Sequence, residues 1–192
     1  MKYFIIGLGN PGETYRGTRH SVGRATVEHF SKKNGFPELK FDKEINALIA
    51  EGKIGKQGVT LLLPETFMNK SGETIKKLHA IYYKLQAEQL IVIHDDLDLP
   101  LGVMKISFNR GSGGHRGVES IARALKTREF IRVRIGISPK KKPQGEKKVN
   151  DFILGHFKPL ELTVLKKVMQ KGEKALVAIV MEGKERAMNE FN

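Results

Sequence analysis

Histidine, aspartate and asparagine side chains stand at four points of the chain where together they could hydrolyse an ester. His20 precedes a helix-like segment, and the run HDDLD (residues 94–98) offers three carboxylates. A carboxylate bonded to one imidazole nitrogen fixes the tautomer and raises the basicity of the other nitrogen, which can then take a proton from water. The amides of Asn10 and Asn69 could hold the oxyanion that water attack creates. These residue types indicate a hydrolase with His20 as its base.

The run HDDLD also has a metal-binding alternative. Its carboxylates and imidazole suit Mg²⁺ or a metal pair. Against this, strand alternation would send Asp95 and Asp96 to opposite faces of a sheet, and the chain has no H-E-x-x-H or EF-hand spacing. We therefore expect no metal and no other cofactor.

Two further site types are disfavoured. The stretch FIIGLGNPG (residues 4–12) has glycines at the G-x-G-x-x-G spacing, but Pro11 removes a backbone N–H and no helix follows at once. The alternative is a tight turn after an edge or central strand. The segment GSGG around Ser112 does not make the G-x-S-x-G turn of a serine hydrolase.

Alternating strands and helices would position these side chains. Hydrophobic periodicity predicts strands at 2–7, 90–96, 103–108 and 131–137, a hairpin of strands 45–52 and 59–64, and helices at 22–34, 71–85, 118–125 and 160–183. Residues 138–148 read as a lysine-rich loop. Ser71 and His115 are expected to cap helices. The expected fold is α/β, one domain over residues 1–192, with a twisted mixed β-sheet flanked by helices.

Ligands of such a sheet gather where loops leave the strand ends. The loops after the first strand and after the hairpin carry Asn10, Tyr15, Arg19, His20, Phe67, Met68 and Asn69. The strand at 103–108 is followed by the loop NRGSGGHRG. We expect Tyr15, Phe67 and Met68 to contact the substrate.

Charge and composition bound the partners. Lys and Arg total 34 against 21 Asp and Glu, a formal net charge of +13 that attracts polyanions such as RNA. No apolar run approaches the roughly 20 residues of a membrane span, and the N-terminus lacks a signal-peptide pattern. The chain has no cysteine, which fits a reducing compartment. We expect a soluble, cytoplasmic protein that does not associate with membranes.

Five ordered motifs resemble those of the bacterial peptidyl-tRNA hydrolase family. They are GLGNPGETYRGTRHSVG, ETFMNKSG, HDDLDLPLG, GSGGHRG and RVRIGI, and they span nearly the whole chain. The resemblance implies a monomeric α/β hydrolase of translation that works without a metal. Such an enzyme cuts the ester between a peptide and the 3′ end of tRNA and so frees the tRNA for reuse.

The resemblance also implies roles for individual residues. His20 would activate water, and Asp95 would orient it. The residues implied to position the peptidyl ester and the 3′ adenosine are Asn10, Met68 and Asn69. Lys105 and Arg134 match positions that clamp the tRNA 5′-phosphate in the family. The positive charge then has a cause, because a tRNA acceptor stem is recognised largely through its phosphates and shape.

Two positions depart from the family pattern. Ser21 follows His20 where the family commonly has asparagine, and Arg116 replaces a substrate-contacting asparagine in GHRG. An arginine offers five donors, so Arg116 either binds a phosphate or ribose or is a solvated side chain that points away from the cleft. The alternative function is a non-catalytic RNA-binding member of the same fold, like the plastid intron-splicing relatives. Retention of His20, Asp95, Asn10 and Asn69 together favours catalysis.

Overall fold

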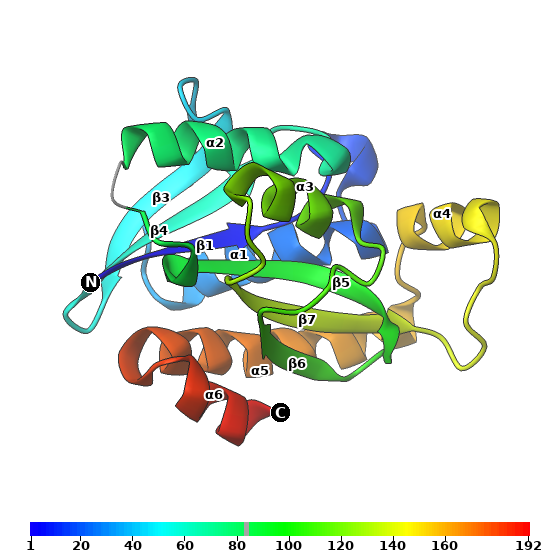
Figure 1. Ribbon diagram of the computed structural model, residues 1–192. Coiled ribbons are helices and arrows are strands. Elements are labelled where there is room, and N and C mark those ends of the chain that lie inside the picture. Colours follow the sequence, from blue (N-terminus) through cyan, green and yellow to red (C-terminus); the bar gives the residue numbers. More distant parts are fainter. Residues whose placement is uncertain (83–84) are drawn as a thin grey trace.

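Seven strands form one mixed sheet in the computed structural model, which describes residues 1–82 and 85–192 (Figure 1). The strands are β1 (Lys2–Gly7), β2 (Lys40–Asp42), β3 (Ala47–Ile54), β4 (Gln57–Pro64), β5 (Leu90–Pro100), β6 (Met104–Phe108) and β7 (Ile131–Ser138). Their order in the sheet is β2-β3-β4-β1-β5-β7-β6. The central strands β4, β1, β5 and β7 are parallel, and β2, β3 and β6 are antiparallel to their neighbours. The predicted α/β fold with a mixed sheet is confirmed.

Helices cover both faces of this sheet. They are α1 (Val22–Lys33), α2 (Ser71–Ile81), α3 (Arg116–Leu125), α4 (Glu146–Leu154), α5 (Pro159–Glu182) and α6 (Lys184–Phe191). Helices α2 and α3 lie on one face, and α5 and α6 on the other, while α4 lies off the end of the sheet (Figure 1). Across the described residues, no helix combines the length and the apolar character that a bilayer crossing needs.

The central strands are buried on both sides, which explains their continuous apolar sequence. In β5, Leu90 and Val92 pack with residues of α2 and α3, while Ile91 and Ile93 pack with residues of α1 and α5. The period-two alternation predicted for β7 is also observed. Its isoleucines and valine join the α1 and α5 side, so the arginines between them face the α3 side.

Helix α2 differs from its prediction at both ends. It ends at Ile81 rather than at residue 85, and residues 83–84 of the predicted helix lie outside the described residues. Its N-cap is Lys70, not Ser71. A 3-10 turn over Met68–Lys70 leads directly into the helix, so Ser71 is already helical and its hydroxyl donates to the Met68 carbonyl at 2.9 Å. His115 does cap α3, as predicted.

Three short elements, β2, α4 and α6, were not predicted. Helix α4 begins within the stretch expected to be a lysine-rich loop and has no fully buried residue. Distant contacts hold it instead. The Arg19 guanidinium lies 4.3 Å from the Phe152 ring of α4 and pairs with Glu161 of α5 at 2.8 Å.

The glycines after β1 serve close packing more than turning. A Cβ on Gly7 would lie 2.6 Å from the Gly23 carbonyl oxygen, and one on Gly9 would lie 2.9 Å from the Ser21 Cα. Only Gly12 of the three has a positive φ, at 92°. The tight-turn interpretation therefore applies to Gly12 alone, and the other two glycines let the start of α1 lie against the loop after β1.

Candidate active site

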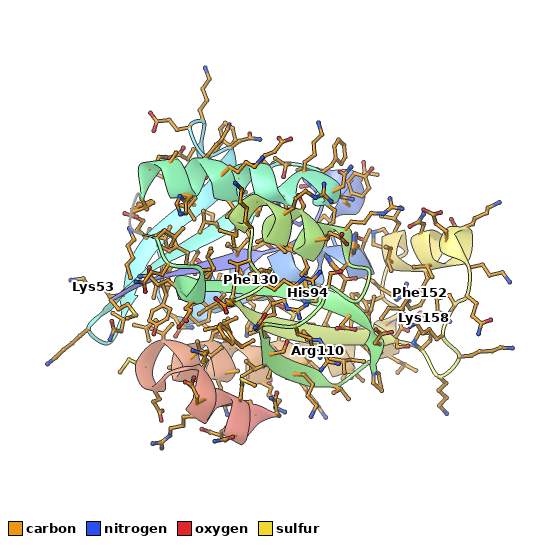
Figure 2. All side chains as sticks on the ribbon, in the orientation of Figure 1. Lys53, His94, Arg110, Phe130, Phe152 and Lys158 are labelled. Carbon is orange, nitrogen blue, oxygen red and sulfur yellow. The ribbon has the colours of Figure 1, made fainter. Side chains whose placement is uncertain are left out.

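A cavity of about 700 Å³ opens where β1, β4 and β5 end, and we call it the His20 cavity. The predicted site residues that line it are Asn10, His20, Phe67, Met68, Asn69, Asp95 and Arg116. The loop before α3, the side chain of His94 on β5 (Figure 2) and helix α4 complete its walls. The carboxyl ends of parallel strands are the usual place for a ligand in such sheets.

His20 and Asp95 form a buried pair at the wall of this cavity. His20 Nδ1 lies 2.9 Å from Asp95 Oδ1 and 3.0 Å from Oδ2. A second imidazole reaches the same carboxylate, because His115 Nε2 lies 3.0 Å from Asp95 Oδ1. Asp95 is only 4% exposed, so these two rings take the place of solvent around its charge.

Hydrogen-bond partners assign the tautomers of both rings. The Val118 backbone N–H donates to His115 Nδ1 at 3.3 Å, so the proton of neutral His115 sits on Nε2 and is donated to Asp95. In the same way, neutral His20 donates its Nδ1 proton to Asp95. The lone pair of His20 Nε2 is therefore left for another partner, which is the state a general base needs.

Electrostatics favour an ionised Asp95 and a basic His20. Burial by itself raises the pKa of Asp95, but His20 and His115 outweigh it and hold that pKa well below its usual range. Burial lowers the pKa of His20, yet the Asp95 carboxylate more than compensates, so the pKa of His20 is raised. Arg116 opposes this rise, because its positive charge lowers the pKa of His20.

Asn10 presents an amide donor beside this pair. Its Oδ1 accepts the Met68 backbone N–H at 2.8 Å. Because a backbone N–H can only donate, the oxygen of the Asn10 amide is fixed in this position and its NH₂ group is left as a donor. Asn69 also lines the cavity and is exposed.

Tyr15 supports the cavity wall without lining it. Its ring packs edge-on against Phe67, with ring centroids 6.2 Å apart. Phe67 itself lines the His20 cavity and is 56% exposed, so a large apolar surface stands open at its mouth.

The carboxylates of HDDLD go to different partners. Asp95 bonds the two histidines, Asp96 Oδ2 accepts from Arg134 Nε at 2.7 Å, and Asp98 pairs with Lys142. This separation agrees with the strand alternation that argued against a metal site in this run.

Another donor set, of His20, Asp95 and His115, has its ligand atoms within 4.8 Å of one another. Two imidazoles and a carboxylate are a donor set used for transition metals. The tautomer of His115 does not suit this use. A metal would need the lone pair of Nε2, which would put the proton on Nδ1 against the Val118 N–H. The arrangement fits hydrogen bonding better than metal ligation.

Lys105 and Arg134 lie side by side but outside the His20 cavity. They are cross-strand partners on β6 and β7. Lys105 Nζ donates to the Asn192 carbonyl oxygen at 2.6 Å, and Arg134, which is 8% exposed, pairs with Asp96. A phosphate bound here would share Arg134 with that carboxylate.

The two positions that depart from the family pattern have local partners. Ser21 accepts a hydrogen bond from the Thr18 hydroxyl at 3.2 Å. Arg116 lines the cavity and donates to Glu146 of α4 at 2.6 Å. Both members of this ion pair are exposed. Arg116 thus links the start of α3 to α4 across the cavity mouth.

Sequence reasoning missed two parts of this site. His115 was interpreted as a helix cap only, and its second nitrogen bonds Asp95. Helix α4 was not predicted, and its first three residues fall in the expected lysine-rich loop; Val149, Ile153 and Leu154 of this helix form an apolar wall of the cavity. The motif GSGGHRG is a signal for the first, and the helical spacing of Val149, Phe152 and Ile153 is a local signal for the second.

Comparisons with known proteins point to one family. The peptidyl-tRNA hydrolase family model matches residues 4–192. The peptidyl-tRNA hydrolase of Thermoanaerobacter sp. strain X514 is 41% identical over 190 residues, which cover 99% of each chain. That of Thermodesulfovibrio yellowstonii is 39% identical over 189 residues, or 98% of this chain and 97% of the relative. The crystal structure of peptidyl-tRNA hydrolase from Acinetobacter baumannii matches with a TM-score of 0.91 at 32% identity, covering 99% of this chain and 94% of that one.

Proposed function

Because the chain belongs to the peptidyl-tRNA hydrolase family, it hydrolyses the ester between peptide and tRNA, and we propose that His20 is the general base of this reaction. The observation that carries the proposal is the hydrogen bond from His20 Nδ1 to the buried Asp95 carboxylate at 2.9 Å. It orients the ring, raises the pKa of His20 and leaves Nε2 as a proton acceptor.

The proposed reaction begins with water between His20 Nε2 and the ester carbonyl. His20 takes one proton as the water oxygen bonds to the carbonyl carbon, which leaves negative charge on the carbonyl oxygen. The tetrahedral intermediate then collapses, and the bond from that carbon to the ribose oxygen breaks. Protonated His20 returns its proton to the ribose oxygen, so the products are a free peptide carboxyl group and tRNA with a free 3′ end.

Asn10 and Asn69 are the proposed amide donors to the oxyanion and to the 3′ adenosine. Asn10 is supported by its fixed orientation, because the Met68 N–H occupies its oxygen and leaves its NH₂ group unused by that bond. Met68 and Phe67 would bear on the adenosine and the peptide, with Tyr15 supporting Phe67 from behind.

The proposed substrate partner is the acceptor stem and 3′ end of peptidyl-tRNA. A formal net charge of +13 supports recognition of a polyanion, and Lys105 and Arg134 would bind its 5′-phosphate. We further propose that residues 1–192 act as one domain and as a monomer.

The test is release of N-acetylated amino acid from N-acetyl-aminoacyl-tRNA by the purified protein. The proposal expects turnover of this substrate and also of the short N-acetyl-aminoacyl-adenosine, at a higher KM, because the chemistry lies in the His20 cavity. If the protein hydrolyses neither of these two esters, the proposed function is contradicted. The matched control is the variant Arg186→Gln, which changes an exposed arginine of α6. This variant should hydrolyse both esters at the wild-type rate.

A further inference from the structure

A second cavity, of about 290 Å³, lies between the loop after β6 and the end of α3. We call it the arginine cavity, because the cations that line it are Arg110, Arg123, Lys126 and Arg128. Ser112 lines both this cavity and the His20 cavity, so the two are neighbours across one residue. One carboxylate, that of Glu119, stands in its wall and accepts from the Ser112 hydroxyl at 3.4 Å.

The arginines here differ from most others that the structure describes. Outside this cavity, every arginine in residues 1–82 and 85–192 except Arg132 pairs with a carboxylate. The paired ones are Arg16, Arg19, Arg24, Arg116, Arg134 and Arg186. Within the same described ranges, the arginines without such a partner are Arg110, Arg123, Arg128 and Arg132. Three of these four line one small cavity.

Arg132 on β7 does not line the cavity, but the charges of Arg110 and Arg128 act on it. It is 1% exposed, and its Nε and Nη2 are buried without a hydrogen-bond partner among the described residues. Burial lowers the pKa of Arg132 to about 10, and the charges of Arg134, Arg110 and Arg128 contribute. A buried cation normally has its donors satisfied, because an unpaired one costs stability. Retaining it suggests that an anion supplies the missing partner.

We propose that the arginine cavity binds a backbone phosphate of the unpaired 3′ segment of tRNA. Guanidinium groups suit this ligand because they offer two parallel donors to phosphate oxygens. The inference rests on the proposed function, which places the ester in the neighbouring His20 cavity.

The location of the arginine cavity in the fold indicates that its ligand is the unpaired 3′ segment of tRNA. Ser112 joins the arginine cavity to the ester site. Arg132 is two residues from Arg134 on β7, or about 6.6 Å along a strand, and Arg134 is the proposed contact of the 5′-phosphate. The unpaired 3′ nucleotides connect the ester to the acceptor stem where the 5′-phosphate lies. A cavity that shares Ser112 with the ester site, and whose arginines act by charge on Arg132, is placed for a phosphate of that connecting segment.

Equilibrium binding of deacylated tRNA tests the proposal without relying on hydrolysis. Two ligands are compared, intact tRNA and tRNA trimmed of its unpaired 3′ nucleotides. Arg110→Gln and Arg128→Gln should each weaken binding of intact tRNA about 10-fold and reduce its log-log salt slope by about one. The same variants should bind trimmed tRNA like the wild type.

Lys126→Gly offers a third variant. Lys126 has a φ of 57°, where glycine is unstrained, so its charge can be removed without loss of folding. The matched controls are Lys43→Gln and Arg186→Gln, both of which are exposed and do not line the cavity. Equal loss for intact and trimmed tRNA, or no loss for either, would overturn the proposal.

Arg132→Met separates a binding role from a structural one. Removing a buried, unpartnered charge should raise the Tm, while binding of intact tRNA weakens. A lower Tm with unchanged binding would show that Arg132 serves the fold and would contradict the proposal. A last experiment measures whether inorganic phosphate stabilises the protein against unfolding. If it protects the wild type but not Arg128→Gln against unfolding while tRNA binding is the same in both, the cavity takes a free anion and the RNA assignment is wrong.

Discussion

His20 Nδ1 lies 2.9 Å from Asp95 Oδ1, although the two residues are 75 positions apart in the chain. The segment between β1 and α1 and the middle of β5 meet at this pair, and neither segment contains both partners. The contact sets the tautomer of His20 and, with the Asp95 charge, its basicity. The catalytic proposal therefore depends on this one relationship.

Replacing the carboxylate should move the pH dependence of the reaction. His20 acts as a base only when neutral, so the rate rises with pH through its pKa. Asp95 raises the pKa of His20, so Asp95→Asn should shift the acidic limb of kcat/KM to lower pH and reduce kcat by about 100-fold. The pH profile of both proteins measures this, and an acidic limb that stays in place would contradict the assigned role of Asp95.

Arg116 should act on the same limb in the opposite direction. Its charge lowers the pKa of His20, so Arg116→Asn should shift the acidic limb to higher pH. The Arg116–Glu146 ion pair is exposed, so the free energy of unfolding should change by less than about 0.5 kcal/mol. Arg186→Asn controls for the loss of one positive charge. A limb that moves to lower pH would exclude a direct electrostatic effect of Arg116 on His20.

The sequence predicts the parts of this site that stand in local motifs, and it does not predict contacts between residues that are far apart in the chain. Asn10 and His20 share one motif and Asp95 stands in another, each after a predicted apolar strand, and the structure brings all three to one cavity. His115 was predicted as the cap of α3, and it is one. Its second nitrogen reaches Asp95 only through the fold, so a local pattern could show half of its hydrogen bonds.

The helices and strands that were predicted differ in their hydrophobic patterns from those that were missed. Strands β1, β5 and β7 carry long apolar or alternating patterns, because the two faces of the sheet impose them. Helix α4 has no buried residue and depends on Arg19, which is more than 100 positions away and stacks on Phe152. The prediction of Ser71 as the N-cap of α2 was wrong because a 3-10 turn over Met68–Lys70 precedes the helix. A turn of three residues is too short to show a hydrophobic periodicity in the sequence.

Lys105→Ala and Arg134→Ala should raise the KM for full-length substrate. The log-log salt slope should become shallower by about one for each phosphate that the variant no longer binds. Because Arg134→Ala also leaves the partly buried Asp96 without its arginine partner, its free energy of unfolding should fall by about 2 kcal/mol, whereas that of Lys105→Ala should change little. N-acetyl-aminoacyl-adenosine, which has no 5′-phosphate, is the control substrate. If its KM rises equally, these residues do not contact the 5′-phosphate.

Chelation should leave the activity unchanged. The His115 nitrogen nearest Asp95 carries the proton and is therefore a poor ligand, and a water activated by His20 needs no metal. Initial rates before and after dialysis against EDTA measure this. Loss of activity that Mg²⁺ or Zn²⁺ restores would revive a metal site at His20, Asp95 and His115.

The most direct test is single-turnover hydrolysis of N-acetyl-aminoacyl-tRNA by His20→Ala, measured together with its Kd for deacylated tRNA. A base that acts in the transition state contributes to the rate and little to ground-state affinity. We predict a rate constant reduced by at least about 100-fold with a Kd within about twofold of the wild type. A wild-type rate constant in His20→Ala would contradict the assignment of His20 as the base.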